Sequence, residues 1–122
     1  MIFKIGESYT RDKIHEAFGG EKETYLPQSG KKIVCGCFSL EANPQAPNEI
    51  LVGNAPKVIE KAEILIGQIE PIPVFIKRAS NNWEYKGIYR FRKHSKDKKI
   101  IHEKERSSGR EDLVMIIYLE KV

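Results

Sequence analysis

The spacing of hydrophobic residues near the start of the chain predicts a short helix. Within residues 8–20, Ile14 and Phe18 are four positions apart and lie on one apolar face of a helix. Thr10 is suited to the N-cap, because its hydroxyl can accept a backbone N–H of the first turn. Gly19 follows the last apolar position and ends the helix.

A second helical pattern covers residues 55–68. Val58, Ala62 and Leu65 recur there at spacings of three and four residues, which places them on one face. Asn54 precedes this pattern, and a proline stands in the first helical turn, which is typical of a helix start. Asn54 is therefore predicted to be the N-cap, and contact with the edge of a nucleic-acid base is the alternative role of its side chain.

Three apolar runs have the composition of buried strands. Residues 33–40 are rich in apolar and β-branched side chains, with a thin point at Gly36. Residues 49–53 form a shorter run. Residues 112–121 are apolar at both odd and even positions, so we expect this last strand to lie centrally in the sheet with both faces covered.

A β-hairpin is predicted from residues 73–78 and 83–92, which are joined by a polar turn. In its second strand, aromatic residues occupy alternate positions and are predicted to share one face. These aromatic residues are Trp83, Tyr85, Tyr89 and Phe91. Such a stripe is typical of a buried core, and it is also suited to stacking on bases. Residues 93–111 are predicted to form a long basic connection.

Together these elements predict one domain, residues 1–122, of the α+β class. We expect a small, mixed, curved sheet that is partly closed into a β-barrel, with two short helices. The longest apolar run, Val114–Leu119, is far shorter than the about 20 residues that cross a bilayer. The first residues lack the charged lead and the apolar stretch of a signal peptide. We therefore expect no membrane contact and a cytoplasmic location.

Charge is unevenly distributed along the chain. The formal net charge is +4, from 21 basic and 17 acidic residues. Residues 86–110 contain ten of the basic residues and only three of the acidic ones, so the remainder is slightly acidic. A basic segment on such a body is typical of a protein that binds a polyanion. The alternative is a solvated loop whose lysines keep the protein soluble.

The motifs of the common enzyme and metal-site classes are missing from the sequence. It contains no Walker loop, no HExxH, no GxSxG and no dinucleotide-binding GxGxxG. Cys35 and Cys37 are predicted to face one side of a strand as small buried hydrophobes, and no histidine has metal-type spacing with them. We therefore predict a protein that is not an enzyme and uses no metal or cofactor. A minimal nuclease that relies on His94 or His102 is the alternative.

Several basic residues are candidates for phosphate contacts. They are Lys31, Lys32, Arg78, Arg90, Arg92 and Lys93. The loop at residues 29–32 is equally consistent with a plain basic turn. Among the aromatic residues, Trp83 is the best candidate to face a pocket, because it lies at a strand end beside the asparagine turn.

The order of several short motifs resembles that of PUA/SRA-like β-barrel domains, which accompany prokaryotic restriction endonucleases and defence helicases. The motifs span most of the chain. They are the leading Gly6–Arg11 segment, the helix end Phe18-Gly19-Gly20, the Ser-Gly strand entry at 29–33, Pro-Val-Phe-Ile at 73–76, Trp83-x-Tyr85-x-Gly87-x-Tyr89 and the closing Tyr118-Leu119-Glu120.

This resemblance implies DNA recognition, often of a modified base that is flipped into a pocket on the concave face of the barrel. By the same resemblance, Trp83, Tyr85 and Tyr25 would be the aromatic walls of the pocket, with Asn54 as a polar contact. Such domains usually adjoin a nuclease or motor domain, and these 122 residues contain none. A nuclease or helicase is therefore an expected partner.

Two other functions stay open at this point. PUA-like barrels also bind RNA, and composition does not separate RNA from DNA. The basic segment at residues 86–110 is also suited to docking an acidic protein partner, which would make the chain a regulatory or protein-interaction domain.

Overall fold

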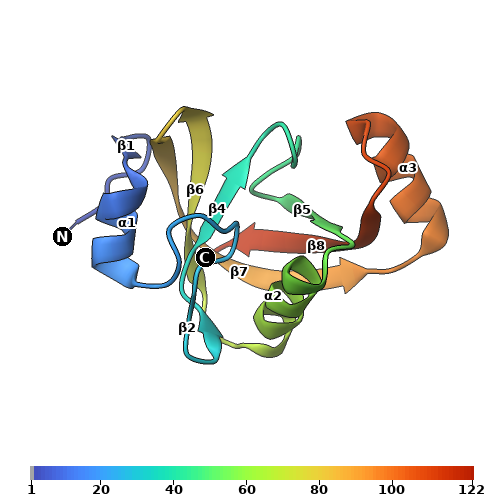
Figure 1. The fold of residues 1–122 in the computed structure, drawn as a ribbon, viewed down its shortest axis with the longest axis horizontal. Coiled ribbons are helices and arrows are strands. Elements are labelled where there is room, and N and C mark those ends of the chain that lie inside the picture. The colour runs from blue at the N-terminus through green and yellow to red at the C-terminus, as the bar shows by residue number, and fades with distance from the viewer. Residues whose placement is uncertain (1) are drawn as a thin grey trace.

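The computed structural model describes residues 2–122, which form three helices, a mixed six-stranded sheet and a separate two-stranded hairpin (Figure 1). The six strands are β1 (Ser8–Tyr9), β4 (Gly36–Ser39), β5 (Glu49–Gly53), β6 (Ile72–Ala79), β7 (Asn82–Ser95) and β8 (Leu113–Lys121). The hairpin consists of β2 (Gln28–Ser29) and β3 (Lys32–Ile33), and the helices are α1 (Arg11–Phe18), α2 (Pro56–Gly67) and α3 (Lys98–Ser108). The α+β class is confirmed.

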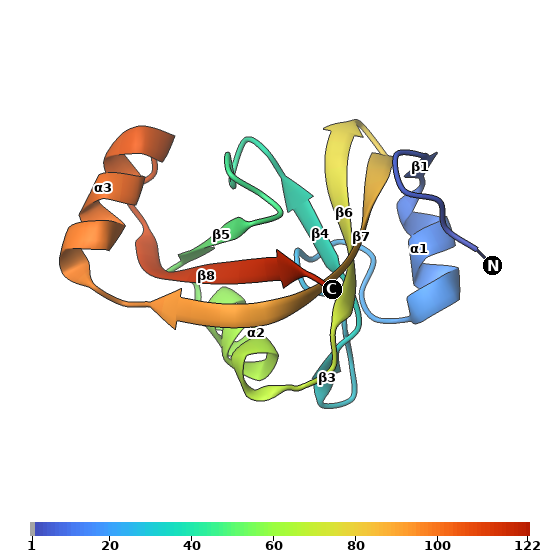
Figure 2. The same cartoon turned by 180° about the vertical axis from the view of Figure 1, so that it is seen from behind.

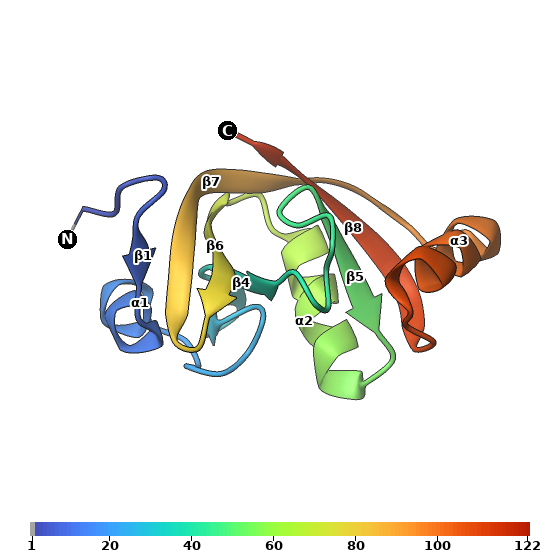
Figure 3. The ribbon, with the colours of Figure 1, turned by 90° about the horizontal axis from the view of Figure 1, so that it is seen from above.

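The strands of the large sheet lie in the order β4-β6-β7-β8-β5, and β1 also pairs with β7. β4 is parallel to β6, and the other pairs are antiparallel. The sheet curves around α2 (Figure 3), but the edge strands β4 and β5 do not pair with each other. The prediction of a mixed, curved sheet is therefore confirmed, and the predicted barrel closure is not found among the described residues.

Most predicted elements lie where the hydrophobic pattern placed them. The strand at residues 49–53 matches β5, and the final strand matches β8, which lies between β7 and β5 as expected. Thr10 caps α1, because its hydroxyl accepts the N–H of Lys13 at 3.2 Å. The predicted N-cap of α2 was wrong: Ala55 occupies that position without a side-chain hydrogen bond, and Asn54 precedes it.

The predicted basic connection at residues 93–111 was also wrong, because β7 continues to Ser95 and α3 follows it. Asp97 caps this helix through its side chain, and Gly109 ends it in the left-handed conformation. The helix has no fully buried residue, and its apolar contacts with the sheet come from Ile100 and Ile101. Two adjacent apolar residues make no helical repeat, which explains why the pattern did not reveal the helix.

A β-bulge in β7 divides the aromatic stripe between two faces of the sheet. Val74 of β6 is opposite Gly87, but the next residue, Phe75, is opposite Tyr85, so Lys86 has no partner. An extra residue reverses the side-chain alternation that follows it. Trp83 and Tyr85 therefore face one side and Tyr89 and Phe91 the other, which corrects the prediction of a single stripe.

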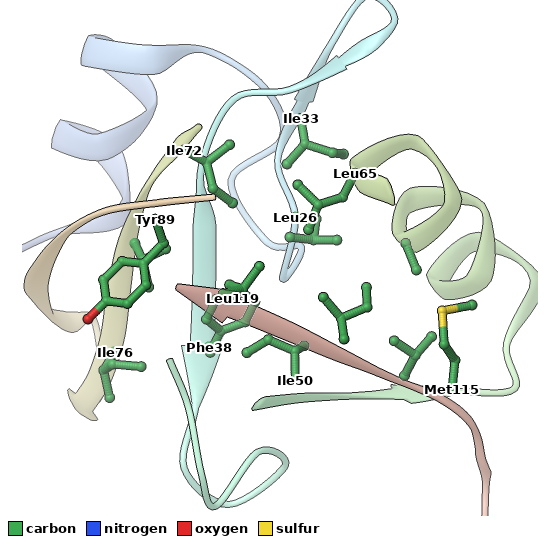
Figure 4. Packing of buried hydrophobic residues seen from close by; sticks show 14 residues of the cluster. Leu26, Ile33, Phe38, Ile50, Leu65, Ile72, Ile76, Tyr89, Met115 and Leu119 are labelled. Atoms are coloured by element: carbon green, nitrogen blue, oxygen red, sulfur yellow. The ribbon is translucent and has the colours of Figure 1, made fainter. Parts of the chain in front are cut away.

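Three apolar clusters follow from this arrangement. The largest fills the space between α2 and the concave face of the sheet, and it contains Phe38, Leu65, Met115 and Tyr89 (Figure 4). The second lies on the opposite face beneath α1 and contains Ile14, Phe75, Cys35, Cys37, Trp83 and Tyr85. The third, which contains Leu51, Leu113 and Ile116, lies beneath α3.

None of the described helices has the length and the hydropathy of a membrane span.

Replacement of Gly87 by alanine should destabilise the protein by roughly 1–3 kcal/mol, because a side chain at this φ of 113° is strained. The new Cβ would also lie 3.1 Å from Lys121 Cε and 3.3 Å from Ile5 Cδ1. Urea denaturation of both proteins measures the difference.

The matched control is Gly67→Ala at the end of α2. A Cβ there meets nothing within 4 Å, so its effect should be neutral or stabilising by up to about 1 kcal/mol. Equal free energies of unfolding for the two variants would contradict the role assigned to Gly87.

Candidate functional site

A cavity of about 380 Å³ opens beside α1, on the face of β4 and β6 that carries the second apolar cluster. Its walls come from α1, the loop that follows α1, β4 and the loop after it, the end of β6, the β6–β7 turn and the start of β7. Residues that line it include Arg11, Tyr25, Cys37, Asn43, Lys77 and Trp83. Segments far apart in the sequence therefore build one site.

Trp83 lies between the apolar cluster and the cavity. It is 9% exposed and belongs to the cluster beneath α1. The guanidinium of Arg11 is 5.0 Å from the centre of its ring, and the ammonium of Lys77 is 6.0 Å away. Both distances allow a cation–π attraction. Trp83 is therefore largely part of the core, and it lines the cavity with the small exposed part of its side chain.

Arg11 is held in place by hydrogen bonds to two neighbouring segments. Its guanidinium donates to the carbonyl oxygens of Thr24 at 3.1 Å and Glu21 at 3.3 Å. Its backbone N–H donates to Oδ1 of Asn81 in the β6–β7 turn at 3.0 Å. Asn81 has a left-handed φ of 52°, which asparagine tolerates better than most residues. These bonds fix the cation over the Trp83 ring.

Tyr25 also lines the cavity, but its hydroxyl is already bonded. The hydroxyl donates to the carbonyl oxygen of Val58 in α2 at 2.6 Å. Burial raises the pKa of Tyr25 well above its usual value, and the nearby charge of Arg110 opposes that rise only in part. Tyr25 therefore offers the side of its ring and no free hydroxyl.

A buried lysine anchors the loop that carries Tyr25. Lys61 of α2 is only 7% exposed, and its ammonium donates to Glu21 Oε2 at 2.7 Å, Leu26 O at 3.2 Å and Gln28 Oε1 at 3.3 Å. Partial burial by itself would raise the pKa of Glu21. The hydrogen bonds from Lys61 and from the N–H of Gln28 outweigh that effect and hold the pKa at about 2.

The cavity carries more positive than negative charge. Its lining residues include the cations Arg11, Lys22 and Lys77 and a single carboxylate, Glu23. Lys22 also forms an ion pair with Asp12 at 3.1 Å. Lys77 is exposed and has neither an ion pair nor a side-chain hydrogen bond within the described part of the chain. It is therefore the cation that can move most freely toward a ligand.

The structure brings only two of the four predicted base-pocket residues to this cavity, Trp83 and Tyr25. The ring of Tyr85 packs against Phe75, with ring centres 5.2 Å apart, and lies within the apolar cluster. Asn54 is exposed just before α2 and does not line the cavity. Tyr85 shares a face with Trp83 but is covered by the rings of Phe3 and Phe75, and Asn54 lies at the start of α2.

The six predicted phosphate-binding residues do not form one surface. Three of them form ion pairs with carboxylates: Lys32 with Glu70, Arg78 with Glu84 and Arg90 with Glu120. Arg92 and Lys93 both lie over the ring of Tyr118, at 5.9 Å and 5.1 Å from its centre. Lys31 is exposed in the turn between β2 and β3.

Sequence reasoning missed Arg11, Lys77 and Asn81 as site residues. The predicted hairpin contained the signal for Lys77, because hairpin register sets Lys77 opposite Trp83. Arg11 is 72 positions from Trp83, and no local pattern indicates that the two meet.

The His, Cys, Asp and Glu side chains of the described residues form no metal site. Within residues 2–122, no three His, Cys, Asp or Glu side chains are placed to hold a metal ion. Cys35 and Cys37 are free thiols, and both are buried, as predicted. A hydrogen bond with Cys37 and burial together raise the pKa of Cys35.

No protein-family model, curated protein or solved structure matches the chain.

The ion pair between Glu21 and Lys61 should stabilise the protein in a pH-dependent way. Its contribution is present above the usual glutamate pKa near 4.5 and is lost as the pH falls toward the folded-state value of about 2. Glu21→Gln should therefore flatten the decline of the free energy of unfolding between pH 4.5 and pH 2. Urea denaturation at a series of pH values measures this.

Glu16→Gln is the control, because Glu16 is an exposed residue of α1 without an ion pair among the described residues. It should leave the pH profile as in the parent protein. A Glu21→Gln profile parallel to that of the parent would mean that the Glu21 carboxylate does not anchor the loop.

Proposed function

We propose that this protein is a DNA-binding module that receives one unstacked base in the cavity beside Trp83. The observation that carries the proposal is the position of Trp83, at the edge of a cavity whose charged lining residues are three cations and one carboxylate. Aromatic faces stack on bases of any sequence, and arginine and lysine bind the phosphates on either side. The resemblance to PUA/SRA-like domains supports the same function.

The cavity is open to solvent on one side, and its volume is compatible with a single base. Small-molecule sites in proteins span about 300–1,000 Å³, and a cavity of about 380 Å³ lies near the lower end of that range. The amide NH₂ of Asn81 has no hydrogen-bond partner among the described residues, and its Oδ1 accepts from Arg11. An unpaired amide at the rim can donate to acceptors on a base edge.

The two cations near Trp83 have different roles in this proposal. Arg11 is held by three hydrogen bonds, so it stays over the ring when a base enters. Lys77 is exposed and has no hydrogen-bond partner among the described residues, so its ammonium can move away from the Trp83 ring. The base then stacks on the ring, and the ammonium pairs with a flanking phosphate. The chain's own residues then bind and orient the base, without a chemical step.

The expectation that the base is a modified one rests on the resemblance rather than on the cavity. PUA/SRA-like domains read modified bases in restriction and defence, which makes a modified duplex the expected ligand and a nuclease or helicase the expected partner. RNA binding is the alternative for the same cavity, and oligonucleotides of both kinds belong in one experiment.

Trp83 is the only tryptophan of the chain, so its fluorescence reports directly on the cavity. Addition of DNA with an extruded base should quench the emission as the base stacks on the ring. The titration compares plain duplex DNA with duplexes that carry 5-methylcytosine, 5-hydroxymethylcytosine or N6-methyladenine, and with single-stranded DNA and RNA. Anisotropy of labelled oligonucleotides measures binding independently.

The two signals separate the possible results. Quenching that saturates together with anisotropy, and that favours one modified duplex, supports base entry. Tighter binding of RNA would move the proposal to the RNA alternative. Binding by anisotropy with unchanged Trp83 emission would overturn base entry.

Lys77→Gln should weaken binding to every DNA of the panel by roughly 3- to 10-fold, the loss expected for one charge-assisted phosphate contact. The order of preference among bases should remain, because Lys77 does not contact the base edge in this proposal. Lys57→Gln makes the same charge change at an exposed position of α2 outside the cavity and should alter binding much less. Equal losses for both variants would indicate a general charge effect rather than a contact at the cavity.

A further inference from the structure

Ion pairing divides the basic segment at residues 86–110 into two groups. In the first group, each cation lies against a carboxylate. These pairs are Lys86 with Glu84, Arg90 with Glu120, Lys104 with Glu49 and Arg110 with Asp112. In the second group, no cation forms an ion pair within residues 2–122. These cations are Arg92, Lys93, Lys96, Lys98, Lys99 and Arg106.

Five of the six unpaired cations lie within residues 92–99, which we call the 92–99 strip. It runs from the end of β7 into the first turn of α3. All five cations are exposed. Asp97 is the only carboxylate of the strip, and its side chain already accepts the N–H of Lys99 as the helix cap. The strip therefore carries as much net charge as the formal +4 of the entire chain.

This arrangement opposes the stability of the local structure. Lys98 and Lys99 stand in the first turn of α3, which has no acidic residue, and cations in that position oppose the helix dipole. Arg92 and Lys93 both lie over the ring of Tyr118, so their partner among the described residues is a neutral ring and not a carboxylate. Sites where a sequence breaks local rules without a structural gain are often functional.

We propose that the 92–99 strip is a second DNA contact, which holds the sugar–phosphate backbone at a distance from the cavity. This inference rests on the proposed function. Duplex DNA carries one negative charge per about 1.7 Å of its axis. Such a continuous row of phosphates matches a row of unpaired cations better than the scattered carboxylates of an acidic protein surface. Arg92 can also bind phosphate oxygens through two N–H groups at once.

The strip and the cavity lie toward opposite ends of the molecule. The cavity adjoins α1, and the strip ends in α3, at the other end of the long axis (Figures 1 and 2). The strip therefore contacts phosphates other than those that flank the bound base. It contributes affinity and salt dependence, and base preference stays with the cavity.

The salt dependence of binding tests the strip. For duplex DNA, log K falls with log salt concentration by about 0.9 per phosphate contact. The triple variant Lys96→Gln, Lys98→Gln and Lys99→Gln should make this slope shallower by roughly 2–3. At low salt, quenching of Trp83 at saturation should match the parent protein, because the cavity is unchanged.

The matched control is the triple variant Lys4→Gln, Lys13→Gln and Lys57→Gln. It removes the same charge from three exposed lysines that lie outside the strip and have no ion pair among residues 2–122. Its slope should stay close to that of the parent. Thermal melting of both variants verifies that they are folded before binding is compared.

Each result has a separate meaning. A parent protein that does not bind any DNA overturns the proposed function, and with it the strip. A parent protein that binds with Trp83 quenching, while both triple variants have the same slope, overturns the strip alone. Polyglutamate that displaces DNA as well as an unlabelled duplex of equal charge also overturns it, because the strip would then be a docking surface for acidic protein segments.

Discussion

The bulge at Lys86–Gly87 is the constraint on which the rest of the structure depends. β7 pairs with β6 along its first half and with β8 along its second half, so it belongs to both ends of the molecule (Figure 2). One extra residue in its middle reverses the side-chain alternation. Trp83 can therefore pack beneath α1 while Tyr89 packs beneath α2. A regular strand would send both rings to one face.

Loops and side chains complete the sheet where strand pairing stops. The backbone N–H of Cys37 in β4 donates to the carbonyl oxygen of Tyr25 at 2.8 Å, so a loop covers this edge. Toward β5, buried Asn43 accepts the N–H of Leu51 at 2.8 Å, and Arg110 donates to the carbonyl oxygen of Leu51 at 3.2 Å. The same loops wall the cavity, so the contacts that stabilise the open sheet also shape the candidate site. Ligand binding and folding stability should consequently be coupled in this protein.

The distribution of ion pairs separates charges that hold the fold from charges that face solvent. Lys61 and Arg110 reach backbone carbonyl oxygens as well as carboxylates, and both tie loops to the body. Lys77 and the cations of the 92–99 strip have no carboxylate partner among the described residues. Because unpaired cations keep their full charge for a ligand, they are better candidates for contact with a polyanion than the basic residues as a whole.

The sequence by itself determined the elements whose signal is local. The spacing of apolar residues over a few neighbouring positions indicates several elements. They are the apolar faces of α1 and α2, the central position of β8 and the β6–β7 hairpin. The concentration of basic residues at 86–110 is likewise a property of the sequence. Trp83 could be selected as a candidate because its place at a strand end depends only on the hairpin around it.

The tertiary structure alone decided which of these residues meet. The bulge depends on the register of β7 against β6, and α3 depends on packing against β5 and β8, so neither leaves a periodic signal of its own. The stacking of Arg11 on Trp83 and the neutralisation of Arg90 by Glu120 join residues that are far apart along the chain. Local patterns indicate whether each segment prefers a helix or a strand. A binding site, and the cations that remain without an ion-pair partner, are instead set by contacts between segments. Those contacts form only when the whole chain has packed.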